Sequence, residues 1–272
     1  MQKKHLTLPY VVWMCLFTIV PLLLVFLYGF TTTNASGDML LTMDNIIKVF
    51  SAENLKVLGR SLLYAAITTV ICLILAYPAA LILAKKKGSA SFISMLFILP
   101  MWMNFLLRTY AWRALLETTG PINMFLGLFG IEPQQFLFTE SAVILGLVYN
   151  FFPFMLMPIQ NICEKIPYSY TEAAEDLGAN KLQTLLRVTL PLTKPGIITG
   201  ITMVFMPTVT TFIISRLLGG GQFMMYGDLI ENQFMLLRDW NFGSALAVVM
   251  MVLLIISMAL LRKYDKDGDA AL

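Results

Sequence analysis

Few residues in this sequence could carry out chemistry. The single histidine, His5, lies in the N-terminal tail, so neither a histidine-based catalytic triad nor a multi-histidine metal site can be assembled. The three cysteines, Cys15, Cys72 and Cys163, lie within or beside apolar runs and lack the paired spacing of metal or disulfide frameworks. No glycine-rich loop of the GxxxxGK[ST] type is present to hold phosphates. The sequence therefore predicts a chain that is not an enzyme and binds no metal or cofactor itself.

The long loop from Glu164 to Pro195 is the most informative segment for function. Ser169 followed by Glu172 fits a capping box, in which each side chain accepts a hydrogen bond from the other residue's backbone N–H. Gly178 can adopt the left-handed conformation that ends a helix and turns the chain sharply. These residues predict a first short helix that presents alanines and an acidic edge.

A second short helix is predicted directly after this turn. Asn180 could cap a helix from Lys181 to about Val188, and Leu190-Pro191 would end it. The two helices would lie along the membrane surface. A lipid-surface helix favours Lys/Arg flanks beside large apolar residues, whereas alanines and a glycine turn let another protein approach the backbone closely. A protein partner is therefore favoured over a helix that merely rests on lipid headgroups.

This loop resembles the EAA loop in the permease subunits of type I ABC importers, whose pattern is EAA, three residues, glycine and a later LP. The matching residues are Glu172, Ala173, Ala174, Leu177, Gly178, Ala179, Leu190 and Pro191. In that family the loop is a coupling helix that docks in a cleft on a cytoplasmic ATPase and moves the membrane helices. The resemblance implies that Glu172, Ala173 and Gly178 make the transmission contacts.

The resemblance also implies partners and a fold. Type I permeases work in pairs, so the expected assembly contains a second permease subunit, two ATPase subunits that hold ATP and Mg, and an extracellular substrate-binding protein. The expected fold is an all-α polytopic membrane protein with six transmembrane helices, the MetI-like fold of these permeases. Loops between spans one and two, three and four, and five and six would meet the binding protein.

The elements that must position this loop are apolar stretches. With 58% hydrophobic and 13% charged residues, the chain lies far from the composition of a soluble domain. Six stretches are long enough to cross the lipid bilayer: Pro9 to Phe30, Ser61 to Ala84, Ser91 to Trp112, Ser141 to Asn161, Gly196 to Leu217 and Ser244 to Leu261. None contains Asp, Glu or Lys, and their internal prolines predict kinks and not span boundaries.

The distribution of basic residues predicts the orientation. If the N-terminus is cytoplasmic, twelve of the 19 Lys and Arg residues lie on the cytoplasmic side, including the run Lys85-Lys86-Lys87. That run could also contact lipid headgroups or a nucleotide. We expect a multi-pass protein of the bacterial inner membrane with both termini cytoplasmic. The net charge of +3 is too small and too scattered to indicate nucleic-acid binding.

These elements divide the chain into three parts. Residues 1–60 hold the N-terminal tail, the first span and the first extracellular loop. Residues 61–262 form a core of five helices that includes the coupling loop at 164–195. Residues 263–272 form a cytoplasmic tail.

Within the family, the chain is most similar to the permease subunits of spermidine/putrescine transporters. The segments that carry this similarity are 99–104 with Arg108 and Tyr110, 147–149 with 153–155, 176–179 with 181–184, and 233–234 with 238–240. The resemblance implies import of polyamines by alternating access. Related permeases for iron(III), phosphonates or sugars share parts of these segments, so those cargoes remain alternatives.

A polyamine path needs carboxylates, carbonyl oxygens and aromatic faces that replace the water around its ammonium groups. Candidates for the path are Trp102, Asn104, Tyr110, Tyr149 and Asn150, although such residues also form interfacial belts or bond between helices. The acids nearest the outer mouth are Glu117, Glu140, Asp228, Glu231 and Asp239. Because the spans lack acids, the second permease is expected to be a different chain that supplies carboxylates.

Arg108 is not expected to bind a polycation, because like charges repel. It could be a snorkelling or structural arginine, or it could pair with an acid of the second permease or of the binding protein. Three other classes of protein are alternatives to a permease. An ion-coupled secondary transporter needs ionisable groups inside the membrane or broken helices to bind its coupling ions, and the lack of Asp, Glu and Lys in the spans argues against one. An intramembrane enzyme needs a catalytic pair, which the single histidine in the tail and the absence of acids in the spans do not provide. A scaffold protein remains open.

Overall fold

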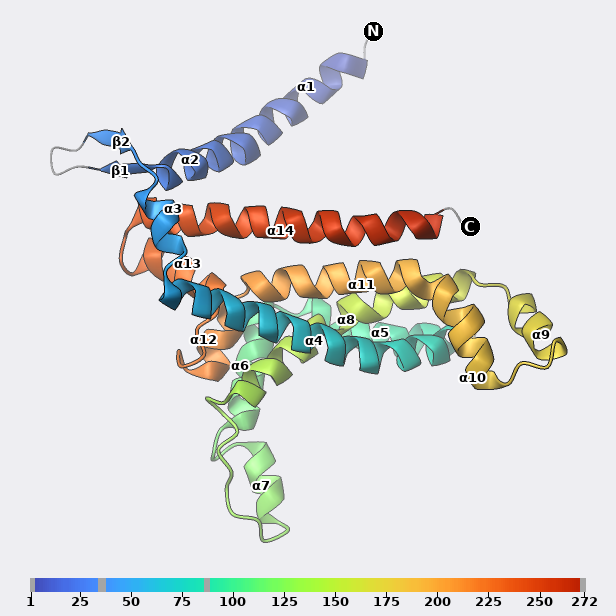
Figure 1. Ribbon diagram of the computed structural model, residues 1–272. Helices are drawn as coiled ribbons and strands as arrows, with labels where there is room; N and C mark the ends of the chain where they lie inside the picture. The colour runs from blue at the N-terminus through green and yellow to red at the C-terminus, as the bar shows by residue number, and fades with distance from the viewer. Residues whose placement is uncertain (1–2, 34–37, 86–88, 270–272) are drawn as a thin grey trace. The chain divides into compact units, whose positions relative to one another are not determined.

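The computed structural model describes residues 3–33, 38–85 and 89–269, and helices dominate it (Figure 1). The helices are α1 (Lys3–Met14), α2 (Val20–Gly29), α3 (Asp44–Val49), α4 (Ala52–Lys85), α5 (Ser89–Trp102), α6 (Phe105–Leu116), α7 (Pro121–Gly127), α8 (Glu140–Lys165), α9 (Ser169–Asp176), α10 (Lys181–Thr184), α11 (Leu190–Thr210), α12 (Ile213–Gly219), α13 (Tyr226–Met235) and α14 (Trp240–Asp269). Two π-turns, η1 (Cys15–Ile19) and η2 (Leu185–Thr189), join α1 to α2 and α10 to α11. A two-stranded antiparallel hairpin of β1 (Thr31–Thr33) and β2 (Met39–Leu41) was not predicted.

Five helical stretches of the described chain are long and apolar enough to cross a membrane, and a bent pair would make a sixth. The five are Pro9–Gly29, Ala52–Lys85, Glu140–Lys165, Lys181–Thr210 and Trp240–Leu261. The bent pair, Phe92–Trp102 with Phe105–Gly127, contains the predicted third span. The bent pair takes the place of the predicted third span, and the count is six only if its two parts together make one crossing.

The third span is not the single helix that the sequence predicts. Its two parts meet at 96°, with the break at Met103 and Asn104. Asn104 begins α6 as its N-cap, because its Oδ1 accepts a hydrogen bond from the backbone N–H of Leu106 at 2.8 Å. Pro100 weakens the preceding turn, since its ring crowds the carbonyl four residues earlier. A proline followed closely by a capping residue breaks this helix instead of kinking it.

The predicted helix end at Leu190-Pro191 is also wrong, because α10, η2 and α11 form one continuous helical stretch. The backbone N–H of Leu190 bonds the carbonyl of Leu185, five residues back, which is the wider π pattern. In a regular helix Pro191 would clash with the carbonyl of Arg187, and the wider turn relieves that clash. The η1 turn stands in the same place before Pro21, where the N–H of Val20 bonds the carbonyl of Cys15.

The chain forms two compact units, and each has its own packing. One unit comprises Met1–Leu58 and Leu229–Ile256, and the other comprises Gly59–Asp228 and Ser257–Leu272. In the first unit, Asn241 ties α14 to the end of α2, since its Nδ2 donates to the carbonyls of Tyr28 and Thr31 at 3.1 and 2.7 Å. A Cβ on Gly29 would lie only 3.2 Å from the backbone nitrogen of Ala245, so these helices pack closely.

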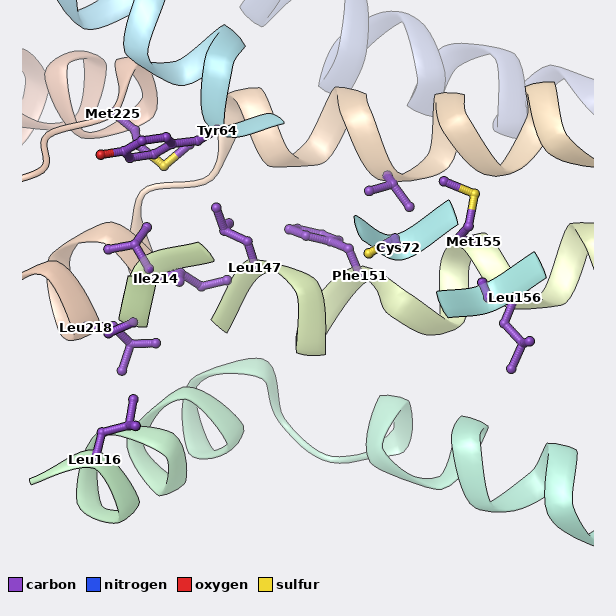
Figure 2. Close-up of a cluster of buried hydrophobic side chains, with 14 of the residues drawn as sticks. Tyr64, Cys72, Leu116, Leu147, Phe151, Met155, Leu156, Ile214, Leu218 and Met225 are labelled. Carbon is purple, nitrogen blue, oxygen red and sulfur yellow. The ribbon is translucent and has the colours of Figure 1, made fainter. Parts of the chain in front are cut away.

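In the second unit, α8 is the central helix and packs along α11. A Cβ on Gly196 would lie 2.8 Å from the carbonyl of Pro158, so the glycine lets the two backbones meet. The buried apolar side chains around α8 come from α4, α6, α11 and α12 as well, and Figure 2 shows them between the ribbons. The labelled members are Tyr64, Cys72, Leu116, Leu147, Phe151, Met155, Leu156, Ile214, Leu218 and Met225. This core holds the helices that flank the 164–195 loop.

Candidate functional site

Within the predicted coupling loop, α9 is a short helix that ends in a sharp turn at Gly178, as the sequence predicts, whereas the second helix continues through η2 into α11. At the end of α9, the N–H of Gly178 bonds the carbonyl of Glu175 at 2.9 Å, and the N–H of Ala179 bonds that of Ala174 at 3.0 Å. Gly178 has a φ of +85°. This pair of bonds with a left-handed glycine is the Schellman motif, which satisfies the last carbonyls of a helix. The predicted role of Gly178 as the helix end is therefore confirmed.

The predicted capping box at the start of α9 is absent. Ser169 is already helical, and Tyr168 occupies the N-cap position without a side-chain hydrogen bond to the helix. The N–H of Glu172 bonds the carbonyl of Tyr168 at 3.1 Å, so the backbone alone closes the first turn after Pro167. The Glu172 carboxylate has no hydrogen-bond partner within the described chain, and its side chain is exposed. It is therefore available to a partner.

The capping box lies instead at the second helix. Asn180 Oδ1 accepts from the N–H of Gln183, and Gln183 Oε1 accepts from the N–H of Asn180, both at 2.9 Å. The sequence identified Asn180 as the cap but not the return bond from Gln183. Both ends of the turn at Gly178 are thus fixed by hydrogen bonds, which holds the two helices in a defined arrangement.

The loop presents apolar side chains that the second unit does not cover. Leu177 is 89% exposed, and α9 buries only Ala174. Large apolar side chains elsewhere on the loop are more than half exposed: Tyr168, Tyr170, Leu182 and Leu186. Of the predicted contacts, Glu172 and Ala173 are exposed, Ala174 is buried and Ala179 is half-buried, while Leu190 and Pro191 lie in the helix that continues into α11. An uncovered apolar surface of this kind is typical of a protein-binding site.

The predicted path residues differ in their burial and in their contacts. Trp102 and Tyr110 are exposed at the end of α5 and on α6. Asn104 caps α6, and Tyr149 on α8 packs edge-on against Trp112 with 5.2 Å between ring centroids. Asn150 is 1% exposed and donates from Nδ2 to the carbonyl of Gly146 at 2.8 Å, while its Oδ1 has no partner in the described chain.

The predicted outer acids differ in their surroundings. Glu117 and Glu140 are exposed, whereas Asp228 is buried and accepts from Ser215 Oγ at 2.5 Å and from the N–H of Met225 at 2.8 Å. Beside it, burial raises the pKa of the Tyr226 phenol, so that side chain stays neutral. Glu231 and Asp239 are half-buried. Asp239 Oδ1 accepts from the N–H of Phe242 at 2.9 Å and so caps the start of α14.

Arg108 does not snorkel to the surface. It is 7% exposed, and its Nε and Nη1 atoms are buried without a hydrogen-bond partner in the described chain. Its guanidinium carbon lies 5.8 Å from the centroid of the Phe105 ring, within cation–π range. A buried guanidinium without an anion is costly, so the face of a ring offsets only part of its lost hydration.

A buried polar link between α5 and α8 was missed from the sequence. Gln160 Nε2 donates to Ser94 Oγ at 2.8 Å and to Glu164 Oε1 at 2.7 Å. Gln160 and Ser94 are both buried. A glutamine inside a predicted span was a usable signal, because polar side chains in membrane helices usually bond to a neighbouring helix. This link joins α5 to the end of α8, where the coupling loop begins.

Most of the chain matches one known protein family. Residues 49–266 match the model described as the binding-protein-dependent transport system inner membrane component. The match covers most of the chain, so the chain belongs to this family of multi-pass inner-membrane transport components. The name of the family refers to transport systems that depend on a binding protein.

Named relatives agree with this assignment. The chain is 39% identical over 247 residues to the spermidine/putrescine transport system permease protein PotB of Escherichia coli K12, a match that covers 89% of this chain and 90% of PotB. Identity to PotB of Haemophilus influenzae is 38%, over 89% of this chain and 86% of that protein. These relatives are transport permeases, in agreement with the prediction of a chain that is not an enzyme.

A solved structure supports the fold. A bacterial ABC transporter involved in the import of the acidic polysaccharide alginate contains a chain that superimposes with a TM-score of 0.80. The superposition covers 96% of this chain and 95% of that chain, at 17% sequence identity. The predicted fold of an ABC importer permease is therefore confirmed.

Proposed function

We propose that this chain is a membrane-spanning subunit of an ATP-driven importer of polyamines, spermidine and putrescine. The observation that carries the cargo assignment is the 38–39% identity to PotB permeases over nearly nine-tenths of the chain. The coupling loop supports the ATP-driven mechanism, because its fixed turn and exposed apolar side chains suit docking on another protein. The core at 61–262 would carry out transport, preceded by the first span within 1–60.

In this proposal ATP and Mg bind to two partner ATPase subunits. The α9 helix would insert in a cleft on one ATPase, with Leu177 in an apolar pocket and Glu172 on its rim. Closure of the ATPases around nucleotide would then push α9, and the continuous stretch from Lys181 to Thr210 would carry the movement into the membrane. The loop, and with it both termini, would lie on the cytoplasmic side.

The cargo would enter from an extracellular binding protein and pass between this chain and a second permease. Trp102 and Tyr110 offer exposed aromatic faces, and the unpaired Oδ1 of Asn150 is an acceptor for an ammonium group if the helices part around it. Glu117 and Glu140 are exposed, whereas Asp228 is buried and Asp239 is half-buried, so the two glutamates are better suited to attract a polycation. Carboxylates inside the membrane would come from the second permease, a different chain.

The cargo assignment is tested with the complete complex in proteoliposomes. ATP hydrolysis is measured with the binding protein and, in separate samples, spermidine, putrescine, iron(III), a phosphonate or a sugar. We expect stimulation by the two polyamines alone. Stimulation by another solute would show that the cargo assignment is wrong, while the assignment as an ATP-driven importer would stand. Uptake driven by an ion gradient without ATP would overturn the importer itself and indicate a secondary transporter.

A further inference from the structure

The segment between α6 and α8 carries an exposed apolar tip. Between Glu117 and Glu132 the sequence contains no charged residue. The exposed large apolar side chains on α7 and just after it are Met124, Phe125, Leu128, Phe129 and Ile131, and Leu128 is 81% exposed. The rings of Phe125 and Phe129 pack edge-on at 5.2 Å. These five side chains are called the apolar tip below.

The tip is held rigidly. Asn123 is buried, and its Nδ2 donates to the carbonyls of Glu117 and Gln134 at 3.2 and 2.9 Å. Its Oδ1 accepts from the N–H of Gln134 at 2.8 Å, so this one side chain connects the segment before α7 to the segment after it. At the base of the loop, a Cβ on Gly120 would lie 2.5 Å from the carbonyl oxygen of Ala114. The turn at this position therefore requires glycine. The apolar side chains are therefore presented in a fixed arrangement.

The tip also has a defined direction within the second unit. The third span bends by 96° at Asn104, so α6 runs across the direction of α5. Figure 1 shows α6 and α7 leaving the bundle of α4, α8 and α11 sideways, at the end opposite α9 and α10. If the bundle crosses the membrane, a segment perpendicular to it lies in the membrane plane. The end opposite the coupling loop is where one lipid–water interface falls.

We propose that the apolar tip is embedded in the lipid headgroup–acyl boundary of the outer leaflet and anchors the broken third span there. Uncharged aromatic and aliphatic side chains on a short helix in the membrane plane suit that boundary. The preceding helix α6 also exposes large side chains that suit a lipid boundary, namely Leu106, Leu107 and Tyr110. This inference rests on the membrane fold and not on the cargo.

A docked binding protein fits the tip less well. Protein interfaces carry a polar rim and about one hydrogen bond per 100–200 Å². The side chains of the tip offer no hydrogen-bonding group, and the polar Asn123 beneath them is occupied within the loop. Lipid chains need no such partners. The chemistry therefore favours lipid as the occupant.

The test measures depth in the membrane. Cys15, Cys72 and Cys163 are replaced by serine, and Leu128→Cys carries an NBD fluorophore in the assembled transporter reconstituted in phosphatidylcholine vesicles. The matched control is Gln135→Cys, which is exposed on the same loop but outside the tip. We expect lipids with a shallow nitroxide to quench the label at position 128 several-fold more than at position 135. Aqueous iodide should show the opposite preference.

Two other results would overturn the proposal. Equal quenching by iodide at both positions would place the tip in water. Shielding at position 128 that develops only when the binding protein is added would make the tip a protein-docking surface. A second experiment needs no label and so cannot be affected by one that disturbs the loop. Leu128→Asp should lower the yield of assembled transporter from membranes several-fold, whereas Gln135→Asp should not. Equal yields would contradict lipid anchoring.

Discussion

At the residue scale, the backbone conformation of Gly178 decides the shape of the coupling loop. Nothing lies within 4 Å of the place where a Cβ would stand, so the space around the residue is open. The restriction comes only from its φ of +85°, which L-residues other than asparagine and aspartate rarely adopt. The glycine therefore sets a direction for the chain and not a packing contact.

We predict that Gly178→Ala lowers ATP-driven uptake several-fold while the protein still inserts, because alanine costs about 1–2 kcal/mol in this conformation. Gly178→Asn should retain more uptake, since asparagine tolerates it better. The matched control is Gly221→Ala, at a glycine with a φ of +78° and equally open surroundings but far along the chain from the loop. Uptake in proteoliposomes is the measurement, and equal losses at both glycines would contradict a specific role for the loop.

Individual residues of the site could be predicted where a local rule decides them. Gly178 and Asn180 were correctly assigned because a left-handed turn and an N-cap each depend on one residue type. The prediction of Ser169 as an N-cap was wrong, since the backbone closes the first helical turn one residue earlier, directly after Pro167. The pairing of Asp228 with Ser215 could not be foreseen, because it joins residues 13 positions apart through the fold.

At the scale of elements, the contact between α8 and α11 depends on glycines. A Cβ on Gly196 would approach the backbone of Pro158 and Ile159 within 3.1 Å, and one on Gly200 would lie 3.2 Å from the carbonyl oxygen of Met155. Backbone atoms cannot rotate away, so the helices would have to separate. Close approach of this kind is the main way in which membrane helices gain packing energy without a hydrophobic driving force between them.

We predict that Gly196→Ala destabilises the permease by about 1–3 kcal/mol, the usual cost of overpacking. Gly59→Ala, in the exposed early part of α4, should instead stabilise it by about 0.5–1 kcal/mol, since no atom lies near and alanine favours the helix. Thermal unfolding of the purified complex in detergent compares the two. An unchanged midpoint for Gly196→Ala would show that α8 and α11 are less tightly packed.

The sequence located the apolar spans but not their irregularities. The position of a span follows from the hydrophobicity of about 20 residues taken together, so no single residue decides it. Prolines do not show by themselves whether a helix bends, widens or breaks. Pro191 follows a π-turn within a continuous helix, whereas Pro100 precedes a break because Asn104 begins a new helix. Those outcomes depend on neighbouring residues and on packing.

At the scale of the whole molecule, the acid-free spans bear on the composition of the assembly. The six predicted spans contain no Asp, Glu or Lys, and a polycation needs anionic or polar groups in place of water. Two copies of this chain would together provide no carboxylate within those stretches. A different second permease supplies that chemistry more simply.

We therefore predict that one copy of this chain is present in each transporter. Two copies with different affinity tags are expressed together with the other components, and the complex is purified through one tag. The second tag should be absent. Two tagged forms of the ATPase serve as the control, and they should be recovered together. Recovery of both permease tags would indicate a homodimer.

The continuous stretch through η2 has a mechanical consequence. Figure 1 shows the chain changing direction where α10 meets α11, yet the hydrogen bond from Leu190 to Leu185 keeps the helix closed through that bend. A flexible joint would absorb a push at the α9 end, whereas a hydrogen-bonded bend transmits torque. A movement of α10 would therefore be passed to α11 as a rotation about the bend, which lies just before Pro191.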